Sequence, residues 1–247
     1  MTPGEAPALI LGAGSDIARA LAERLAGRGH PLMLAAREPA KIERDRADLA
    51  ARYGVEVTAH RYDALETGGI DGVLDALPRS PRIAVCAVGY MPEQEASAAD
   101  PALAERVIAT NFTGPALTLE ALARRMAAED ADTAIVAIAS VAGDRGRARN
   151  YVYGAAKAGF ATWLSGMRQK YARTRLHVMT VKPGFVATAM TEGMDLPGAL
   201  TTDPGPRADR ILRGLDRRRQ VHYDLAWRGI MTVIALIPER IFMKLRF

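Results

Sequence analysis

Short apolar runs alternate with longer stretches of helical periodicity along most of this chain, and no other feature restricts its fold as strongly. The apolar runs predict strands at residues 8–11, 32–36, 55–60, 82–88, 133–139, 176–181 and 221–223. The stretches between them predict helices at residues 16–28, 39–53, 70–77, 98–128, 151–172 and 207–218. The strand cores are apolar at both residue parities, as in strands covered on both faces. We therefore expect a single α/β domain in three layers, with a doubly wound parallel sheet between helices.

Length, cysteine content and charge limit the number of domains, the cellular compartment and the kind of partner. The 247 residues, 49% of them hydrophobic, suit one domain better than two. Cys86 is the one cysteine, so no internal disulfide is expected. With no recognisable signal peptide or membrane-length apolar run, the sequence predicts a cytoplasmic protein. The net charge is +5, but residues 207–247 alone hold ten Lys/Arg and four Asp/Glu. Because the basic excess is local, we expect no nucleic-acid partner.

A loop of mostly small residues follows the first predicted strand and opens the first predicted helix. It contains Gly12, Gly14, Ser15, Asp16 and Ile17. Small residues let the backbone approach a pyrophosphate, and a helix N-terminus supplies amide donors and positive potential. The third glycine of a G-x-G-x-x-G pattern would be Ile17, so the pattern is incomplete. The loop is either a phosphate cradle or an ordinary turn capped by Ser15 or Asp16.

Four polar residues form a candidate catalytic group. Tyr153 and Lys157 are four residues apart and share one face of a predicted helix. A nearby ammonium, together with the positive charge of an oxidised nicotinamide, would lower the tyrosine pKa from its ordinary value near 10. Ser140 ends the fifth strand and can donate a hydrogen bond to a carbonyl, while Asn111 would anchor a water or distort its helix. Taken singly, each of these residues also has a purely structural interpretation.

The ordered set of motifs resembles the short-chain dehydrogenase/reductase family across residues 8–223. That family carries a glycine loop, an acidic residue after the third strand, an N-A-G-like segment, Asn, Ser, Y-x-x-x-K and P-G-x-x-x-T. The matching positions are Gly12, Asp63, Ala87-Val88-Gly89, Asn111, Ser140, Tyr153, Lys157 and Pro183-Gly184-Phe185-Val186-Ala187-Thr188. The sequence departs from the pattern where Asp16 and Ala18 replace usual glycines and where the N-A-G-like segment lacks its Asn.

The resemblance implies a Rossmann-like fold and hydride transfer between a nicotinamide cofactor and a carbonyl or alcohol. Tyr153 would protonate the substrate oxygen, and Lys157 would lower the pKa of Tyr153 and bind the nicotinamide ribose. Ser140 would polarise the carbonyl, and Asn111 would hold a proton-relay water. No metal is expected.

The resemblance also implies a set of cofactor contacts. Asp63 would bind the adenine, and Val186 and Thr188 the nicotinamide amide. The other expected contacts are Gly12, Gly14, Ser15, Asp16, Ile17, Arg37, Ala87, Val88, Gly89, Tyr153, Lys157, Pro183 and Gly184.

The end of the second strand bears on the choice of nicotinamide cofactor. Ala36 cannot accept a hydrogen bond from a ribose 2′-hydroxyl, whereas Arg37 could pair with a 2′-phosphate. These residues favour NADP(H). NAD(H) stays an alternative, with Glu38 as the ribose acceptor.

The roles of two segments do not follow from these motifs. Residues 185–206 contain glycines and prolines without periodicity, which predicts a long loop acting as a mobile lid. Residues 224–247 form an apolar and basic extension to the predicted domain 1–223. This extension is interpreted either as a helix packed on the domain or on a partner subunit, or as a hairpin on a membrane surface, peripheral to the inner face.

Segments around Asn111, Val141 and Pro183 resemble the decaprenylphosphoryl-2-keto-erythro-pentose reductase branch of the family. That branch would imply a keto-sugar linked to a polyprenyl phosphate, held by Arg145, Arg147 or Arg149, which otherwise form a solvated loop. The alternatives are a soluble reductase or dehydrogenase of small carbonyls or alcohols, and a non-catalytic nucleotide sensor or scaffold. The resemblance also implies a homodimer or homotetramer.

Overall fold

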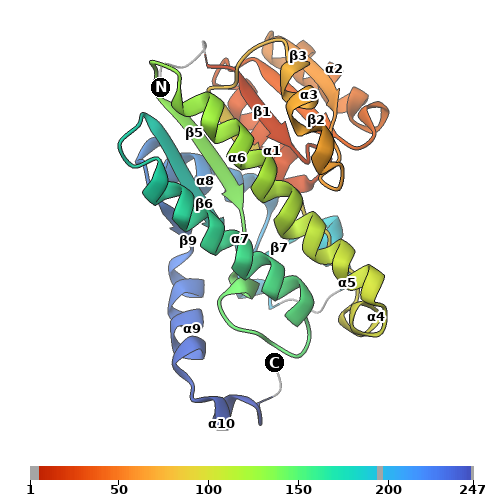
Figure 1. The fold of residues 1–247 in the computed structure, drawn as a ribbon, viewed down its shortest axis with the longest axis vertical. Helices are drawn as coiled ribbons and strands as arrows, with labels where there is room; N and C mark the ends of the chain where they lie inside the picture. The colour runs from red at the N-terminus through yellow and green to blue at the C-terminus, as the bar shows by residue number, and fades with distance from the viewer. Residues whose placement is uncertain (1–5, 194–196, 246–247) are drawn as a thin grey trace.

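The computed structural model describes residues 6–193 and 197–245, so residues 194–196 of the predicted lid and 246–247 of the predicted extension lie outside the described residues. Seven parallel strands form the main sheet, in the order β3-β2-β1-β4-β5-β6-β9 (Figure 1). Their bounds are β1 Ala8–Leu11, β2 Leu32–Ala36, β3 Val57–Arg61, β4 Ile83–Cys86, β5 Thr133–Ile138, β6 Leu176–Lys182 and β9 Val221–Tyr223. The predicted doubly wound parallel sheet is confirmed.

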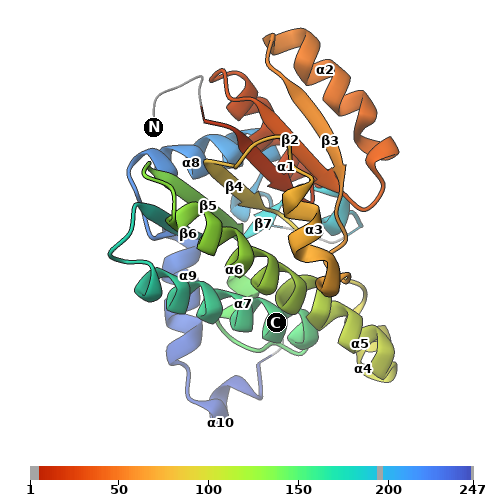
Figure 2. The ribbon, with the colours of Figure 1, turned by 45° about the horizontal axis from the view of Figure 1, so that its top comes forward.

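Helices cover both faces of this sheet. Figures 1 and 2 show α6 and α7 on one face and α8 on the other. The bounds are α1 Asp16–Ala26, α2 Glu43–Tyr53, α3 Ile70–Asp75, α4 Gln94–Ala99, α5 Pro101–Ile108, α6 Gly114–Ala127, α7 Tyr151–Lys170, α8 Pro204–Asp216, α9 Leu225–Leu236 and α10 Glu239–Phe242. Buried residues of α1 and α8 share one core cluster, and those of α6 and α7 share another.

The two clusters explain the apolar character of the strands at both parities. In β1, Ala8 and Ile10 face the α1/α8 cluster, whereas Leu9 and Leu11 face the α6/α7 cluster. Successive side chains of a strand point to opposite faces, so a strand covered on both sides needs apolar residues at every position. Strand β1 pairs with β2 on one side and β4 on the other. The order therefore reverses at β1, where open α/β sheets bind their ligands.

The single helix predicted over residues 98–128 is interrupted twice. Pro101 begins α5, and the Asp100 carboxylate caps it by accepting a hydrogen bond from Ala102 N at 2.9 Å. Residues 109–113 then form a π-helical turn before α6. Such turns are frequent at functional sites.

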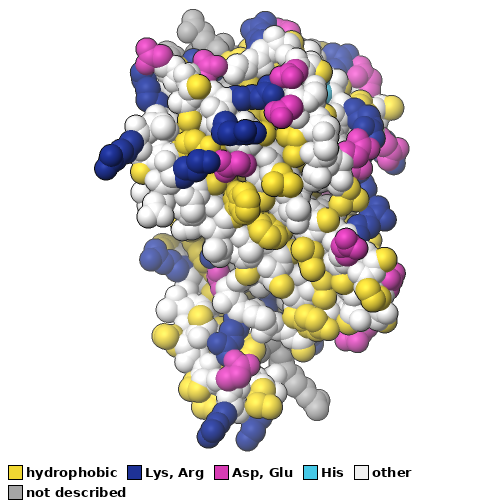
Figure 3. Space-filling model, viewed as in Figure 1, with side chains coloured by type: hydrophobic (Ala, Val, Ile, Leu, Met, Phe, Trp, Pro, Cys, Tyr) yellow, Lys and Arg dark blue, Asp and Glu magenta, His cyan; other side chains and the backbone are white. Residues whose placement is uncertain are grey.

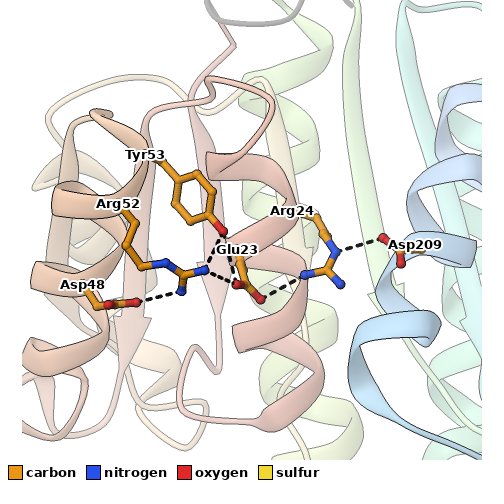
Figure 4. A network of polar contacts seen from close by, with 6 residues as sticks. All are labelled: Glu23, Arg24, Asp48, Arg52, Tyr53 and Asp209. Atoms are coloured by element: carbon orange, nitrogen blue, oxygen red, sulfur yellow. Dashed lines mark hydrogen bonds and ion pairs between the residues drawn. The ribbon is translucent and has the colours of Figure 1, made fainter.

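A network of charged side chains joins three helices across the outside of the α1/α8 layer (Figure 4). The Glu23 carboxylate on α1 accepts hydrogen bonds from Arg52 of α2 at 2.8 Å and from Arg24 at 2.9 Å. Arg24 in turn donates to Asp209 of α8 at 2.9 Å. The Arg52 hydrogen bond lowers the pKa of Glu23 against the effect of burial. The network thus links α2, α1 and α8 into one layer.

The segment predicted as a long irregular loop contains regular structure. Strands β7, Phe185–Val186, and β8, Thr201–Thr202, pair in parallel, and α8 begins at Pro204 rather than at Arg207. Proline is favoured in the first turn of a helix because its missing amide hydrogen is not needed there.

Of the predicted extension, residues 225–236 form α9. Trp227 and Met231 are buried and join Val141 in a third apolar cluster. Helix α9 is therefore packed on the domain through one face, and with α10 it projects from the lower end of the molecule (Figure 1). In the described part of the chain, no helix combines the length and apolar character that crossing a bilayer requires.

Candidate active site

Close backbone packing places Ser140 beside the first turn of α7. A Cβ atom on Gly143 would lie 2.7 Å from the backbone nitrogen of Ala158, and one on Gly154 would lie 2.8 Å from the carbonyl oxygen of Ala142. Since real Cβ contacts are longer, glycine at both positions lets the turn after β5 lie directly on α7. Ser140 Oγ accepts a hydrogen bond from Ala142 N at 3.1 Å, which fixes its position.

Tyr153 and Ser140 meet in this corner. The two side chains are hydrogen-bonded, which lowers the pKa of Tyr153, but desolvation by burial outweighs this effect and raises the pKa to about 12. At neutral pH the chain by itself therefore keeps the tyrosine hydroxyl protonated. The sequence predicted a pKa lowered by Lys157 together with an oxidised nicotinamide; in the chain by itself, burial is the largest cause of the shift and raises the pKa.

Lys157 is buried, with 2% of its surface exposed. Its Nζ donates hydrogen bonds to Ile138 O at 3.0 Å and Val88 O at 3.2 Å, and lies 5.8 Å from the centroid of the Tyr153 ring. Burial lowers its pKa to about 8. The ammonium is thus held between the ends of β5 and β4, with one of its three donors left for another partner.

Asn111 is fully buried in the π-helical turn. Its Nδ2 donates to Tyr90 O at 2.6 Å and Val107 O at 2.8 Å, and its Oδ1 accepts from Tyr90 N at 3.2 Å. Both amide hydrogens are therefore used within the protein. The predicted distortion of the helix is present, and the side chain pins the segment after β4 with both amide hydrogens, which leaves a lone pair of Oδ1 as the group that could bind a water.

The glycine loop turns at Gly12, which has φ +78°. A Cβ there would lie 2.9 Å from the Val88 nitrogen, so the loop packs directly against the segment after β4. Ser15 is the N-cap of α1, and its side chain accepts from Ala18 N at 3.3 Å. Asp16 was the alternative candidate for this cap. It is instead the first helical residue, and its Oδ2 accepts from Ala189 N at 2.9 Å. Asp16 thus ties the loop to the segment after β7.

Charged residues also follow the ends of β2 and β3. Arg37 is exposed and makes no ion pair with another described residue. Glu38 pairs with Lys41 at 2.7 Å, and this hydrogen bond lowers the pKa of the Glu38 carboxyl. Asp63 Oδ1 accepts from Leu65 N at 3.0 Å, which leaves its second oxygen available.

The P-G-x-x-x-T segment is fixed by the C-terminal helix α9. A Cβ on Gly184 would lie 1.9 Å from Trp227 Nε1, and this nitrogen donates to Leu200 O at 3.1 Å. The Phe185 and Trp227 rings meet edge to face at 4.9 Å. Thr188 lies at the start of the next turn, where Thr191 donates to Val186 O at 2.7 Å. Sequence reasoning did not detect this role of Trp227, because no local pattern relates it to Gly184.

One cavity of about 540 Å³ brings the predicted site residues together. Those in its lining are Gly12, Gly14, Ser15, Asp16, Ile17, Arg37, Asp63, Ala87, Val88, Gly89, Ser140, Tyr153, Lys157, Pro183, Gly184, Val186 and Thr188. Asn111 lies behind this lining. Residues that sequence reasoning did not assign also line it: Lys41, Tyr90, Met91, Asn150 and Met190. Of the three arginines considered for phosphate, Arg147 lines the cavity.

The cavity suits a dinucleotide cofactor. Gly12, Gly14 and Ser15 line it at the N-terminus of α1, at the point where the strand order reverses. A model of the family described as short chain dehydrogenase matches residues 6–196 of the chain. The chain belongs to the short-chain dehydrogenase family. It is accordingly an NAD(P)-dependent oxidoreductase.

Individual members of the family resemble this short-chain dehydrogenase over nearly its whole length. An uncharacterised oxidoreductase of Mycobacterium tuberculosis is 32% identical, with 98% of each chain covered. One of Streptomyces coelicolor is 32% identical over 96% of this chain and 94% of its own. The solved structure of a short-chain dehydrogenase from Sphingobium yanoikuyae in complex with NADPH is 25% identical, with a TM-score of 0.77, covering 98% of this chain and 96% of that one.

Proposed function

We propose that this short-chain dehydrogenase transfers hydride between NADP(H) and a carbonyl or alcohol, with Tyr153 as the proton donor in the direction of reduction. The observation that carries the proposal is the convergence of Ser140, Tyr153 and Lys157 in the cavity that also receives the glycine loop. When bound, the cofactor supplies or accepts the hydride. The residues of the chain hold the substrate oxygen and move its proton.

Each of the three side chains has one task in this proposal. Ser140 Oγ accepts one backbone hydrogen bond and is hydrogen-bonded to Tyr153, and its hydroxyl would turn to donate to the substrate oxygen when a substrate binds. The Tyr153 hydroxyl is protonated at neutral pH and gives its proton to that oxygen as charge develops there. Lys157 stabilises the resulting phenolate with its charge, and its remaining donor is available to the nicotinamide ribose.

Transfer of deuterium tests this reaction directly. NADPH carrying deuterium at C4 of the nicotinamide is mixed with a panel of ketones, and the alcohols are analysed by mass spectrometry. We expect one deuterium per molecule at the carbinol carbon. No alcohol from any ketone while NADPH binds would favour a non-catalytic nucleotide-binding role, and alcohol formed without deuterium from NADPH labelled at both C4 positions would contradict hydride transfer from the nicotinamide.

The preference for NADP(H) rests on Arg37. Its guanidinium lines the cavity without an ion-pair partner among the described residues, while the charge of Glu38 is matched by Lys41. The relative from Sphingobium yanoikuyae was solved with NADPH. Arg37→Ala should raise the KM for NADPH about tenfold or more and leave that for NADH unchanged. Arg44→Ala, exposed and outside the cavity lining, is the control. A preference for NADH that survives Arg37→Ala would refute the phosphate role.

We also propose that residues 224–247 form an extension that contacts an anionic membrane surface. Leu225, Val233 and Leu236 of α9 are 85%, 65% and 77% exposed, and exposed Arg228 and Lys244 accompany them. Such a mixture suits an interface between lipid and water. It supports a keto-sugar linked to a polyprenyl phosphate as the substrate, because Trp227 of the same helix packs on the cavity wall.

Flotation with vesicles tests the membrane contact. The wild type should float with phosphatidylglycerol vesicles more than with phosphatidylcholine vesicles. A double variant, Val233→Glu with Leu236→Glu, changes only exposed side chains and should stay in the soluble fraction. Equal flotation of the two proteins would reject the contact.

A homo-oligomer is the third part of the proposal. Hydrophobic side chains gather over α6 and α7 on the face seen in Figure 3. Ile108, Leu117 and Trp163 are among the exposed large hydrophobic residues of α5, α6 and α7. Sedimentation of the wild type as a monomer at micromolar concentration would refute it.

A further inference from the structure

Arg147 lies in the loop between the turn after β5 and the start of α7, and it lines the cavity together with Ser140 and Tyr153. Its position is therefore on the side of the proton donor. Arg37, the candidate ligand of the cofactor phosphate, follows β2, a strand separated from β5 by β1 and β4.

Arg147 forms no ion pair with any residue that the structure describes. Its Nε is buried without a hydrogen-bond partner, and the guanidinium makes no ion pair or hydrogen bond with any other described residue. The neighbouring acid, Asp144, is already engaged. Its Oδ1 accepts from Lys182 Nζ at 2.5 Å, and its Oδ2 accepts from the Tyr223 hydroxyl. Lys182 therefore pairs with Asp144, which attracts Arg147 through its charge but forms no ion pair with it.

The two arginines nearby behave differently. Arg145 donates to Glu239 at 2.5 Å and to Ile237 O at 3.4 Å, and it lies over the Phe242 ring at 4.4 Å. It thus holds α9 and α10 and is not available to a ligand. Arg149 is exposed and outside the cavity lining. Arg147 is the one of the three that is both turned to the cavity and unpaired among the described residues.

A partly buried cation without an ion pair is costly to a fold. Buried charges are ordinarily paired. Burial lowers the pKa of Arg147, because removing the charged guanidinium from water costs free energy. Asn150, three residues further and also in the cavity lining, has a buried Oδ1 without a partner. Two polar groups without partners in one wall of the cavity indicate that the partner is a ligand.

We propose that Arg147 is the anchor for an oxyanion of the substrate, a carboxylate or a phosphate, so that this enzyme acts on anionic carbonyl compounds. The proposal rests on the proposed function, because it takes the substrate carbonyl to lie at Ser140 and Tyr153. It concerns the part of the substrate that does not react. The rest of the cavity wall includes Met91, Phe185 and Met190, which suit the carbon skeleton.

Two matched pairs of substrates test the anchor and distinguish its two forms. Levulinate is compared with methyl levulinate for a carboxylate, and dihydroxyacetone phosphate with dihydroxyacetone for a phosphate. In the wild type, kcat/KM should be about tenfold or more higher for the charged member of one pair. Arg147→Met should abolish that ratio with little change for the neutral member, Arg147→Lys should retain part of it, and Arg149→Met all of it. Equal kcat/KM within both pairs, or a ratio that survives Arg147→Met, would overturn the proposal.

A stability measurement separates this proposal from the reaction itself. Without ligand, Arg147→Met should raise the thermal midpoint, because methionine keeps much of the length and removes the unpaired charge. Inorganic phosphate or acetate should raise the midpoint of the wild type and of Arg149→Met more than that of Arg147→Met. If the anions stabilise Arg147→Met as much as the wild type, the anchor is refuted even if ketones are reduced. If they discriminate and no ketone is reduced, the anchor stands and the proposed reaction fails.

Discussion

Gly12 and Gly14 differ in what their backbones require, although both belong to one loop. Gly12 has a positive φ and touches the backbone of Ala87 and Val88, so a side chain there would meet atoms that cannot move aside. A Cβ on Gly14 would be 3.9 Å from the Ile42 side chain, an ordinary contact. The backbone conformation and close packing therefore require glycine at Gly12. At Gly14 the protein leaves room for a side chain, so glycine there serves the approach of a ligand.

Gly12→Ala should therefore lower the free energy of unfolding by roughly 1–3 kcal/mol. It should also weaken NADPH binding, because the loop must move away from the segment after β4. Gly14→Ala is the matched variant, and its free energy of unfolding should change by less than about 1 kcal/mol. Chemical denaturation of both variants checks this. Equal destabilisation would show that the close contact at Gly12 is not limiting.

At the residue scale, the sequence predicted which side chains meet in the cavity, because each follows a strand of a parallel sheet or starts a helix beside one. It could not predict how they are bonded. The donors of Lys157 go to the carbonyls of Val88 and Ile138, and Asn111 is bonded to Tyr90, 21 positions away. The absence of an ion pair between Arg147 and Asp144 likewise depends on Lys182 and Tyr223, which both donate hydrogen bonds to Asp144.

Helix α9 is the element that connects the C-terminal extension to the active site. Trp227 is 5% exposed and packs on Gly184, Phe185 and Leu200. The helix starts after Asp224, which pairs with the fully buried Arg207 of α8. The segment carrying P-G-x-x-x-T is therefore held in place by α9, a helix that contains none of the family motifs.

Trp227→Ala should lower the free energy of unfolding by about 3–5 kcal/mol, since it removes a large buried side chain. It should also raise the KM for carbonyl substrates, because Phe185 in the cavity lining loses its neighbour. Leu225→Ala, at an 85% exposed position of the same helix, should stay within about 0.5 kcal/mol of the wild type. Denaturation and steady-state kinetics check both effects. A wild-type KM in a destabilised Trp227→Ala would separate α9 from the active site.

The strands were the elements easiest to predict, because a buried parallel strand needs apolar residues throughout and ends in a polar turn. A distortion of the helix at Asn111 was predicted, but the bounds and the π-helical form of residues 109–113 were not, because they depend on the bonds of Asn111 to the distant backbone of Tyr90. The packed face of α9 depends on a glycine more than forty positions earlier, which helical periodicity does not report. Local patterns therefore predicted the sheet. The π-helical turn and the packing of α9 depend on contacts between distant segments, which local patterns do not report.

Over the whole molecule, the histidines are uniformly disfavoured as cations. Burial lowers the pKa of His30, His60, His177 and His222. Both ring nitrogens of His222 are buried without partners, and Arg207 and Arg219 add to the effect of burial. In the unfolded chain a histidine takes up its proton near pH 6.5. As the pH falls through this value, the unfolded state binds more protons than the folded state.

Stability should therefore be full above pH 6.5 and decline as the pH falls toward the folded-state pKa values. We expect the free energy of unfolding at pH 5.5 to be about 1–3 kcal/mol below that at pH 7.5. His222→Leu should make this decline shallower. Urea denaturation at the two pH values checks this. Equal stability at both would contradict the assignment of buried neutral histidines.

The kinetics and cofactor affinity of Tyr153→Phe test the central claim most directly. The variant keeps the ring and removes only the hydroxyl. If Tyr153 is the proton donor, kcat should fall by about 10²–10⁴-fold while the Kd for NADPH, followed by its fluorescence, stays within about twofold. A kcat close to that of the wild type, with NADPH still bound, would contradict the account.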